Sequence, residues 1–216
     1  MQVGDDSLEE IVQAFLAASV SYRIGRAARL LAEHPEIAEH SLQTAVVLGD
    51  SVRLKREAAA DPGFATRRDP RTGWTALHAV CASRWHLDPA RAEGLFAAAA
   101  LLLDAGADPN GLSADGRWSP LECAVTSANS DRRNERIVRI LLDRGAEVHD
   151  RDLYAAGFAG SWCVRMLIAR APNVPDIAER ALGAPISLGD VETLRLLLDA
   201  VLTRAATATA MAIPSP

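Results

Sequence analysis

The sequence predicts an all-α protein, organised as a solenoid of about six helix–turn–helix units. Alanine supplies 41 of the 216 residues and aromatic residues only 5%, a composition that favours helices over strands. A leucine run that ends in Gly-Ala occurs at residues 101–110 and again 39 positions later, at 140–149. Glycine followed by a capping residue recurs at Gly49, Gly160 and Gly189, between shorter and longer helical stretches. One pair of helices cannot bury its apolar side alone, so we expect the copies to stack.

The first helix of a unit is marked by a short motif. Residues 73–79 (GWTALHA) align with residues 117–124 (RWSPLECA). Thr75 and Ser119 are expected to cap these helices, and Pro120 suits a first helical turn. We expect the glycines named above to end the first helices, and the following Asp50, Ser51, Ser161 and Asp190 to cap the second helices. The polar stretches after the leucine runs are expected to form exposed turns.

The pattern divides the chain into six units with short ends. The units are expected at 7–40, 41–72, 73–116, 117–151, 152–175 and 176–202. Residues 1–6 are expected to be disordered, and residues 203–216 to form a tail or to continue over the last helix. The leucines expected in the core are Leu30, Leu31, Leu48, Leu77, Leu101, Leu102, Leu121, Leu141, Leu142, Leu167, Leu196 and Leu197.

These motifs resemble ankyrin repeats. Thr75-Ala76-Leu77-His78 is similar to the Thr-Pro-Leu-His motif of that family, and residues 101–110 are similar to its leucine run followed by Gly-Ala-Asp and Asn. The third and fourth units are longer than the family's period of about 33 residues, with the extra residues around 83–93 and 127–135. The resemblance implies a curved stack that acts by binding, with a partner along the concave groove.

We expect a non-catalytic protein–protein interaction module that binds a partner protein or peptide. The candidate binding residues are Trp74, Trp118, Arg71, Arg117, Arg84, Thr126 and Ser127. Tryptophan is enriched at binding hot spots, and arginine beside it favours an acidic partner. The alternative for the two tryptophans is that their rings pack over neighbouring turns and staple the stack together.

The insertion at 83–93 supports a second hypothesis. It adds no stacking area, so it could close a pocket lined by Trp85, His86 and Asp88, as in a small-molecule binder or an atypical enzyme. Alternatively, the segment tucks back onto the stack. Asp88 followed by Pro89 also predicts a capped helix start.

Several other classes are not expected. Cys81 lies near His78 in sequence, but the resemblance to ankyrin repeats implies that a small residue at this position faces the core, so we expect no enzyme nucleophile there. No metal-binding or phosphate-loop motif occurs, and we expect no cofactor. The net charge of −5 argues against nucleic acid. The longest apolar run, residues 95–103, is too short for a membrane span. Three widely spaced cysteines and an acidic start suggest a cytoplasmic protein. The terminal units could mediate a homodimer.

Overall fold

The computed structural model describes residues 3–61, 63–128, 132–171 and 174–211, and the side chains of these residues from 7 to 202 except 174–177. This part of the chain is helical, and its one β feature is an isolated bridge between Arg68 and Thr75. The all-α prediction is therefore confirmed. No helix among the described residues combines the length and the apolar character that crossing a bilayer requires.

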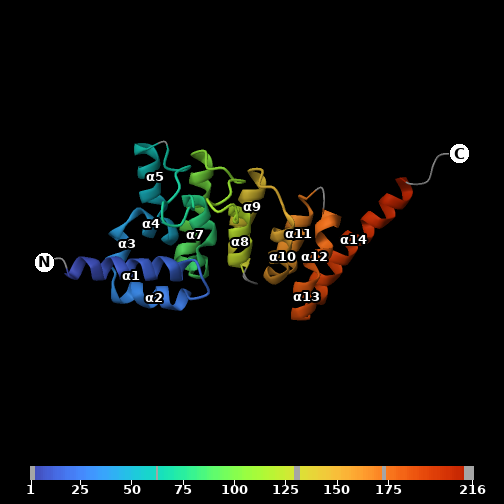
Figure 1. The fold of residues 1–216 in the computed structure, drawn as a ribbon, viewed down its shortest axis with the longest axis horizontal. Coiled ribbons are helices and arrows are strands. Elements are labelled where there is room, and N and C mark those ends of the chain that lie inside the picture. The colour runs from blue at the N-terminus through green and yellow to red at the C-terminus, as the bar shows by residue number, and fades with distance from the viewer. Residues whose placement is uncertain (1–2, 62, 129–131, 172–173, 212–216) are drawn as a thin grey trace.

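The helices follow one another along the longest axis of the molecule, with the two termini at opposite ends (Figure 1). In chain order they are α1 (Val3–Ser19), α2 (Ile24–Glu33), α3 (Ile37–His40), α4 (Leu42–Leu48), α5 (Ser51–Ala60), α6 (Ala76–Ala82), the 3₁₀ helix η1 (Arg84–Leu87), α7 (Pro89–Asp104), α8 (Pro120–Ala128), the 3₁₀ helix η2 (Arg132–Asn134), α9 (Glu135–Asp143), α10 (Asp150–Ala159), α11 (Ser161–Ile168), α12 (Val174–Ala181), α13 (Gly183–Leu188) and α14 (Val191–Met211).

The helices form two layers. In the first layer α4 packs on α6, α6 on α8, α8 on α10, and α10 on α12. In the other layer α5 packs on α7 and α7 on α9, while further along α11 packs on α14. The pairs α4–α5, α6–α7, α8–α9 and α10–α11 join the two layers. At the N-terminal end α1 packs on both α2 and α4.

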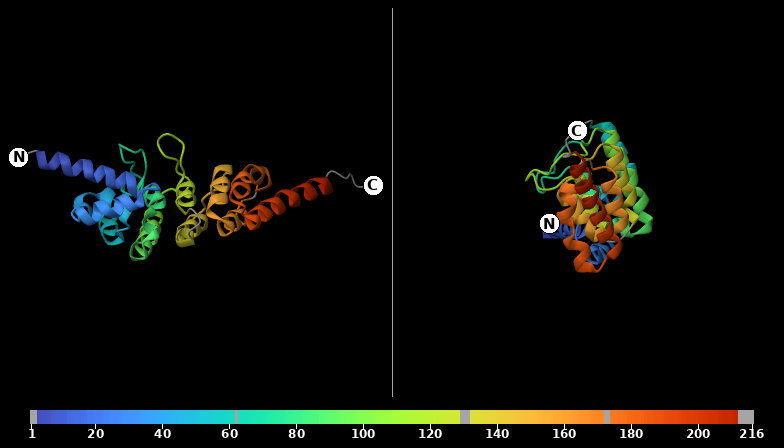
Figure 2. Two further views of the ribbon diagram at one scale, coloured as in Figure 1. Left: turned by 90° about the horizontal axis from the view of Figure 1, so that it is seen from below. Right: turned by 90° about the vertical axis from the view of Figure 1, so that its right-hand side faces the viewer.

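Two loops project from the same side of this row, one after α5 and one after α7 (Figure 2). Each loop is closed by an equivalent backbone hydrogen bond. The Asp69 N–H donates to the Trp74 carbonyl at 2.7 Å, and the Ser113 N–H donates to the Trp118 carbonyl at 2.8 Å. The aligned sequence motifs therefore form the same turn twice, each turn leading into a first-layer helix.

The turn between α4 and α5 shows why the sequence repeats glycine followed by a capping residue. Gly49 has a φ of +71°, and a β-carbon there would lie 2.5 Å from the Leu95 backbone nitrogen on α7. Glycine is therefore required both by the backbone conformation and by the close approach of α7. The next residue, Asp50, caps α5 by accepting a hydrogen bond from the Arg53 N–H at 3.0 Å.

The core runs between the two layers and is mostly aliphatic. Eight of the twelve leucines predicted in the core are buried, namely Leu48, Leu77, Leu102, Leu121, Leu141, Leu142, Leu167 and Leu197. The other four, Leu30, Leu31, Leu101 and Leu196, are half-buried and pack against the core from its edge.

The helix boundaries differ from the sequence expectation at the two ends. α1 begins at Val3, so residues 3–6, which belong to the segment 1–6 expected to be disordered, are helical. α14 reaches Met211, which extends it into the segment 203–216 expected as a tail or as a continuation over the last helix. Residues 1–2 and 212–216 lie outside the described residues.

Candidate functional site

We call the face made by the two projecting turns and the start of α10 the loop-side surface, and define it by Arg71, Trp74, Arg117, Trp118 and Arg151. The three arginines are exposed, and the two tryptophans are half-buried. The turns are joined to each other, because the Ala114 N–H donates to the Gly73 carbonyl at 3.0 Å. Four of the seven predicted binding residues therefore lie on one continuous surface.

The two tryptophans also pack against the core. The Trp74 ring lies 6.3 Å from the ring of His78. His78 Nδ1 lies 2.8 Å from the Thr75 hydroxyl, and His78 Nε2 lies 3.0 Å from the Trp118 carbonyl oxygen, which places the donated proton on Nε2. Burial lowers the pKa of His78, and the positive charge of Arg68 lowers it further. His78 therefore joins α6 to the second turn as a neutral ring.

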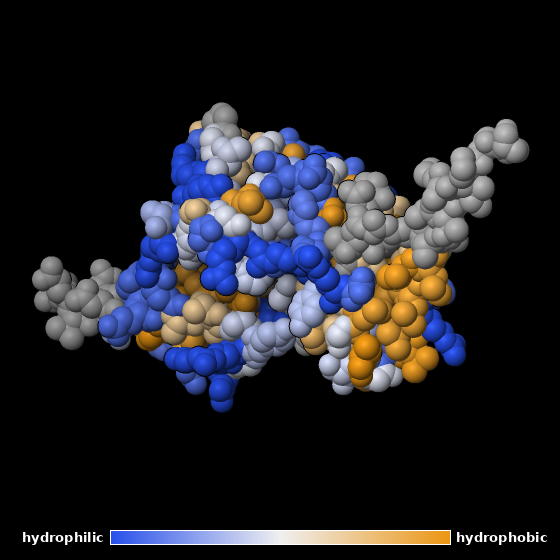
Figure 3. All heavy atoms as spheres, turned by 45° about the vertical axis from the view of Figure 1, so that its right-hand side comes forward, coloured by the Kyte–Doolittle hydropathy of each residue, from blue (hydrophilic) through white to orange (hydrophobic). Residues whose placement is uncertain are grey.

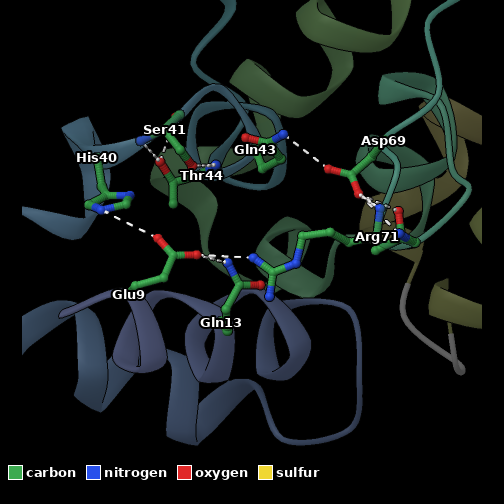
Figure 4. A network of polar contacts seen from close by, with 9 residues as sticks. Glu9, Gln13, His40, Ser41, Gln43, Thr44, Asp69 and Arg71 are labelled. Atoms are coloured by element: carbon green, nitrogen blue, oxygen red, sulfur yellow. Dashed lines mark hydrogen bonds and ion pairs between the residues drawn. The ribbon is translucent and has the colours of Figure 1, made fainter. Parts of the chain in front are cut away.

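Arg71 is held by the N-terminal helix. Its Nη1 donates to Glu9 of α1 at 3.0 Å, and the same carboxylate accepts a hydrogen bond from Gln13 and lies 3.8 Å from His40 Nε2 (Figure 4). These bonds from Gln13 and Arg71 lower the pKa of Glu9. The first turn is tied to α4 as well, because Gln43 donates to Asp69 at 3.0 Å. A partner of Arg71 must therefore compete with Glu9.

Arg117 carries the least restrained charge on this surface. No ion pair of its guanidinium group is found among the described residues, whereas Arg151 forms one with Glu122 at 3.3 Å. Arg151 also donates to the Arg117 carbonyl at 2.8 Å, which ties α10 to the second turn. Burial raises the pKa of Glu122, and Arg151 opposes that shift.

Three predicted binding residues, Arg84, Ser127 and Thr126, lie outside the loop-side surface. Arg84 is only 7% exposed and lies over the ring of Tyr22. Ser127 is buried, and its hydroxyl donates to the Cys81 carbonyl at 2.9 Å, which links α8 to α6. Thr126 is half-buried beside it.

The three residues expected to line an alternative pocket at the insertion instead make contacts within the stack of helices. Trp85 is buried, its ring centroid lies 6.1 Å from that of Phe15, and its indole N–H donates to Ser19 at 2.9 Å. His86 is buried as well. Asp88 caps α7 by accepting from the Ala90 N–H at 2.9 Å, so the helix start predicted at Pro89 is confirmed. The insertion therefore tucks back onto the stack and onto α1.

The cysteines are ordinary core residues. Cys81, Cys123 and Cys163 are buried and unpaired, and burial raises the pKa of each thiol. His78, three residues before Cys81, is directed to Thr75 and Trp118. The described residues contain no cluster of three or more side chains suited to hold a metal ion.

The C-terminal end of the row leaves an apolar face uncovered by described residues. It is seen as the orange area beside the last helices in Figure 3. The exposed apolar side chains of α13 and α14 are Ile186, Leu188, Val191, Leu198 and Leu202. The predicted homodimer through the terminal units has this face available.

Sequence reasoning missed the region around Tyr22, Arg23, Arg26 and Arg29, where α1 turns into α2. A signal was present, because residues 11–32 contain three arginines and no acidic residue. No protein-family model, curated protein or solved structure matches the chain.

Proposed function

We propose that the chain is a non-catalytic interaction module, an ankyrin-like stack that binds a partner protein or peptide on its loop-side surface. The observation that carries the proposal is the repeated turn, which presents Trp74 with Arg71 and Trp118 with Arg117 on one side of a two-layered row of helices. A surface built on packed helices is ordered before binding, so a partner meets little ordering cost.

The local bonds of the motif residues support the ankyrin-like assignment. Thr75 and His78 form a reciprocal capping box at the start of α6. Asn110, at the end of the leucine-run motif, donates to the Gly145 carbonyl at 2.9 Å and accepts from the Glu147 N–H at 2.8 Å. His78 also donates to the Trp118 carbonyl at 3.0 Å, so each motif joins one unit to the next, as expected of a stack whose stability comes from contacts between neighbours.

The charges of the loop-side surface favour an acidic partner. Arg117 is exposed, and Arg71 is bound to the exposed carboxylate of Glu9, where an ion pair contributes little because water screens it. A partner carboxylate can replace such a pair at small cost. The half-buried indoles beside the arginines would supply the apolar part of the contact.

The test is charge reversal at the two turns. Arg71→Glu with Arg117→Glu should weaken binding of a partner by at least tenfold, because like charges then face an acidic surface. Arg56→Glu on the exposed side of α5 is the matched control. Affinity purification identifies the partner, and calorimetry with the purified pair measures the binding constant.

The Arg56 control should unfold within about 0.5 kcal/mol of the wild type, as surface substitutions usually do. Arg71→Glu also places a second carboxylate beside Glu9, so urea denaturation of the double variant must show that it is folded under the conditions of the binding assay. A binding constant that the double reversal leaves unchanged contradicts the proposal, and so does an equal loss in the Arg56 control.

A further inference from the structure

The corner between α1 and α2 contains an open hollow of about 650 Å³, lined by Tyr22, Arg23, Gly25, Arg26 and Arg29. The three arginine side chains are exposed, and no hydrogen bond or ion pair of their guanidinium groups is found in the described part of the chain. The facing part of α1, residues 12–19, has no acidic residue. Three positive charges therefore share this hollow without a carboxylate to balance them.

The N-terminus of α2 opens at the same place. Arg23 at the cap position makes no side-chain capping bond, and the first amides of the helix are those of Ile24 and Gly25. No heavy atom lies within 4 Å of the position that a β-carbon on Gly25 would take, so the helix end is accessible. Free amides and the helix dipole favour an anion at such an end.

Arg84 provides an independent observation that points to an anion. It is 7% exposed, its Nε has no hydrogen-bond partner, and no ion pair to it is found among the described residues. Its Cζ lies 4.5 Å from the centroid of the Tyr22 ring, and Tyr22 itself lines the hollow. A buried guanidinium without a carboxylate is costly, and the face of one aromatic ring offsets only part of that cost. Arg84 does not itself line the hollow, so a negative charge bound there would act on Arg84 across the ring of Tyr22.

We propose that this hollow binds a small phosphate-bearing ligand with at least two negative charges. Arg23, Arg26 and Arg29 donate to its oxygens, the first amides of α2 receive one phosphate group, and Arg84 stabilises the charge from behind Tyr22. Phosphate suits this arrangement better than carboxylate, because its oxygens point in several directions and can accept from three separate guanidinium groups and a helix end.

Calorimetric titration of the full chain with inorganic pyrophosphate tests this proposal. Arg26→Gln with Arg29→Gln should weaken binding by about tenfold or more, since charge-assisted hydrogen bonds are lost. Arg56→Gln removes the same charge from the exposed side of α5 and should bind as the wild type does. Absence of binding, or equal binding by the double variant, overturns the proposal.

Two further measurements separate the components of the site. Arg84→Met should weaken pyrophosphate binding and raise the midpoint of thermal unfolding, because an unpaired buried charge is removed. A binding constant unchanged by this substitution overturns the role of Arg84. Citrate should bind at least tenfold more weakly than pyrophosphate, and equal binding overturns the assignment to phosphate. The loop-side variant Arg71→Glu with Arg117→Glu should bind pyrophosphate normally, so this site is tested separately from the proposed function.

Discussion

Asp152 on α10 gives the chain a pH dependence whose sign can be worked out from the structure. The residue is 1% exposed, its Oδ2 accepts from the His149 N–H at 2.8 Å, and its Oδ1 is buried without a partner among the described residues. Burial raises the pKa of this carboxyl from 3.8 to about 6; the nearby Glu122 on α8 adds to the rise, and the His149 N–H and Arg151 oppose it. The folded chain therefore keeps this proton to a higher pH than the unfolded chain does.

The free energy follows from this difference in pKa. The stabilising contribution of the protonated carboxyl is fully present below pH 3.8 and is lost as the pH rises through about 6. A difference of about two pKa units corresponds to about 3 kcal/mol. Asp152→Asn keeps an oxygen for the His149 N–H and removes the charge.

Urea denaturation of both proteins between about pH 4 and about pH 8 measures this effect. As the pH rises over that range, the free energy of unfolding of the Asn variant should increase by about 2–3 kcal/mol relative to that of the wild type. Carboxylates with a lowered pKa, such as Glu9 and Asp69, also make stability depend on pH. They are present in both proteins, so their contributions cancel when the two free energies of unfolding are subtracted. A difference between the two proteins that stays constant with pH would refute the reasoning.

Three other predictions concern packing. Leu102→Ala should lower the free energy of unfolding by about 2–5 kcal/mol in urea titrations, because Leu102 is fully buried; a loss below about 1 kcal/mol would contradict this. Gly49→Ala should destabilise the chain by more than about 1 kcal/mol in the same assay, since its φ is +71° and its β-carbon would meet the α7 backbone, whereas Gly183→Ala, with nothing within 4 Å, is the control and should be nearly neutral. If the exposed apolar face of α14 mediates the predicted homodimer, sedimentation should show concentration-dependent association that Leu198→Lys with Leu202→Lys abolishes; a monomer at all concentrations would exclude it.

The parts of the fold that the sequence predicts well are those determined locally. A capping side chain acts within three residues, as Asp50 does for Arg53 and Asp88 does for Ala90, so the sequence alone locates these helix starts. The leucine periodicity likewise identifies the buried side of each helix, and Leu101 and Leu196 are only half-buried because they lie at the edge of that side.

The candidate site was harder to predict, because its state depends on contacts between distant segments. Arg71 pairs with Glu9, which lies 62 residues away, and no local pattern indicates that pairing. Arg84 looks like a surface residue in sequence, yet its place after α6 puts it against Tyr22 of the N-terminal corner. The exposure of a polar residue in an insertion is therefore set by the neighbouring segment onto which the insertion folds.

The third residue of each first-layer helix explains why the repeated motif varies along the chain and where the predicted pH dependence arises. It is occupied by Thr44 in α4, His78 in α6, Glu122 in α8 and Asp152 in α10, and all four side chains are buried. Thr44, His78 and Asp152 each form a reciprocal capping box with the residue before the helix. The shared requirement is an acceptor for the cap backbone N–H, which a hydroxyl, a neutral imidazole or a carboxylate can meet equally well. Only His78 belongs to a Thr-Ala-Leu-His motif, so the geometry persists where the residue type does not. Burial raises the pKa of both carboxyl groups at this position and lowers the pKa of His78, so the stability that is lost as the pH rises should arise at α8 and α10.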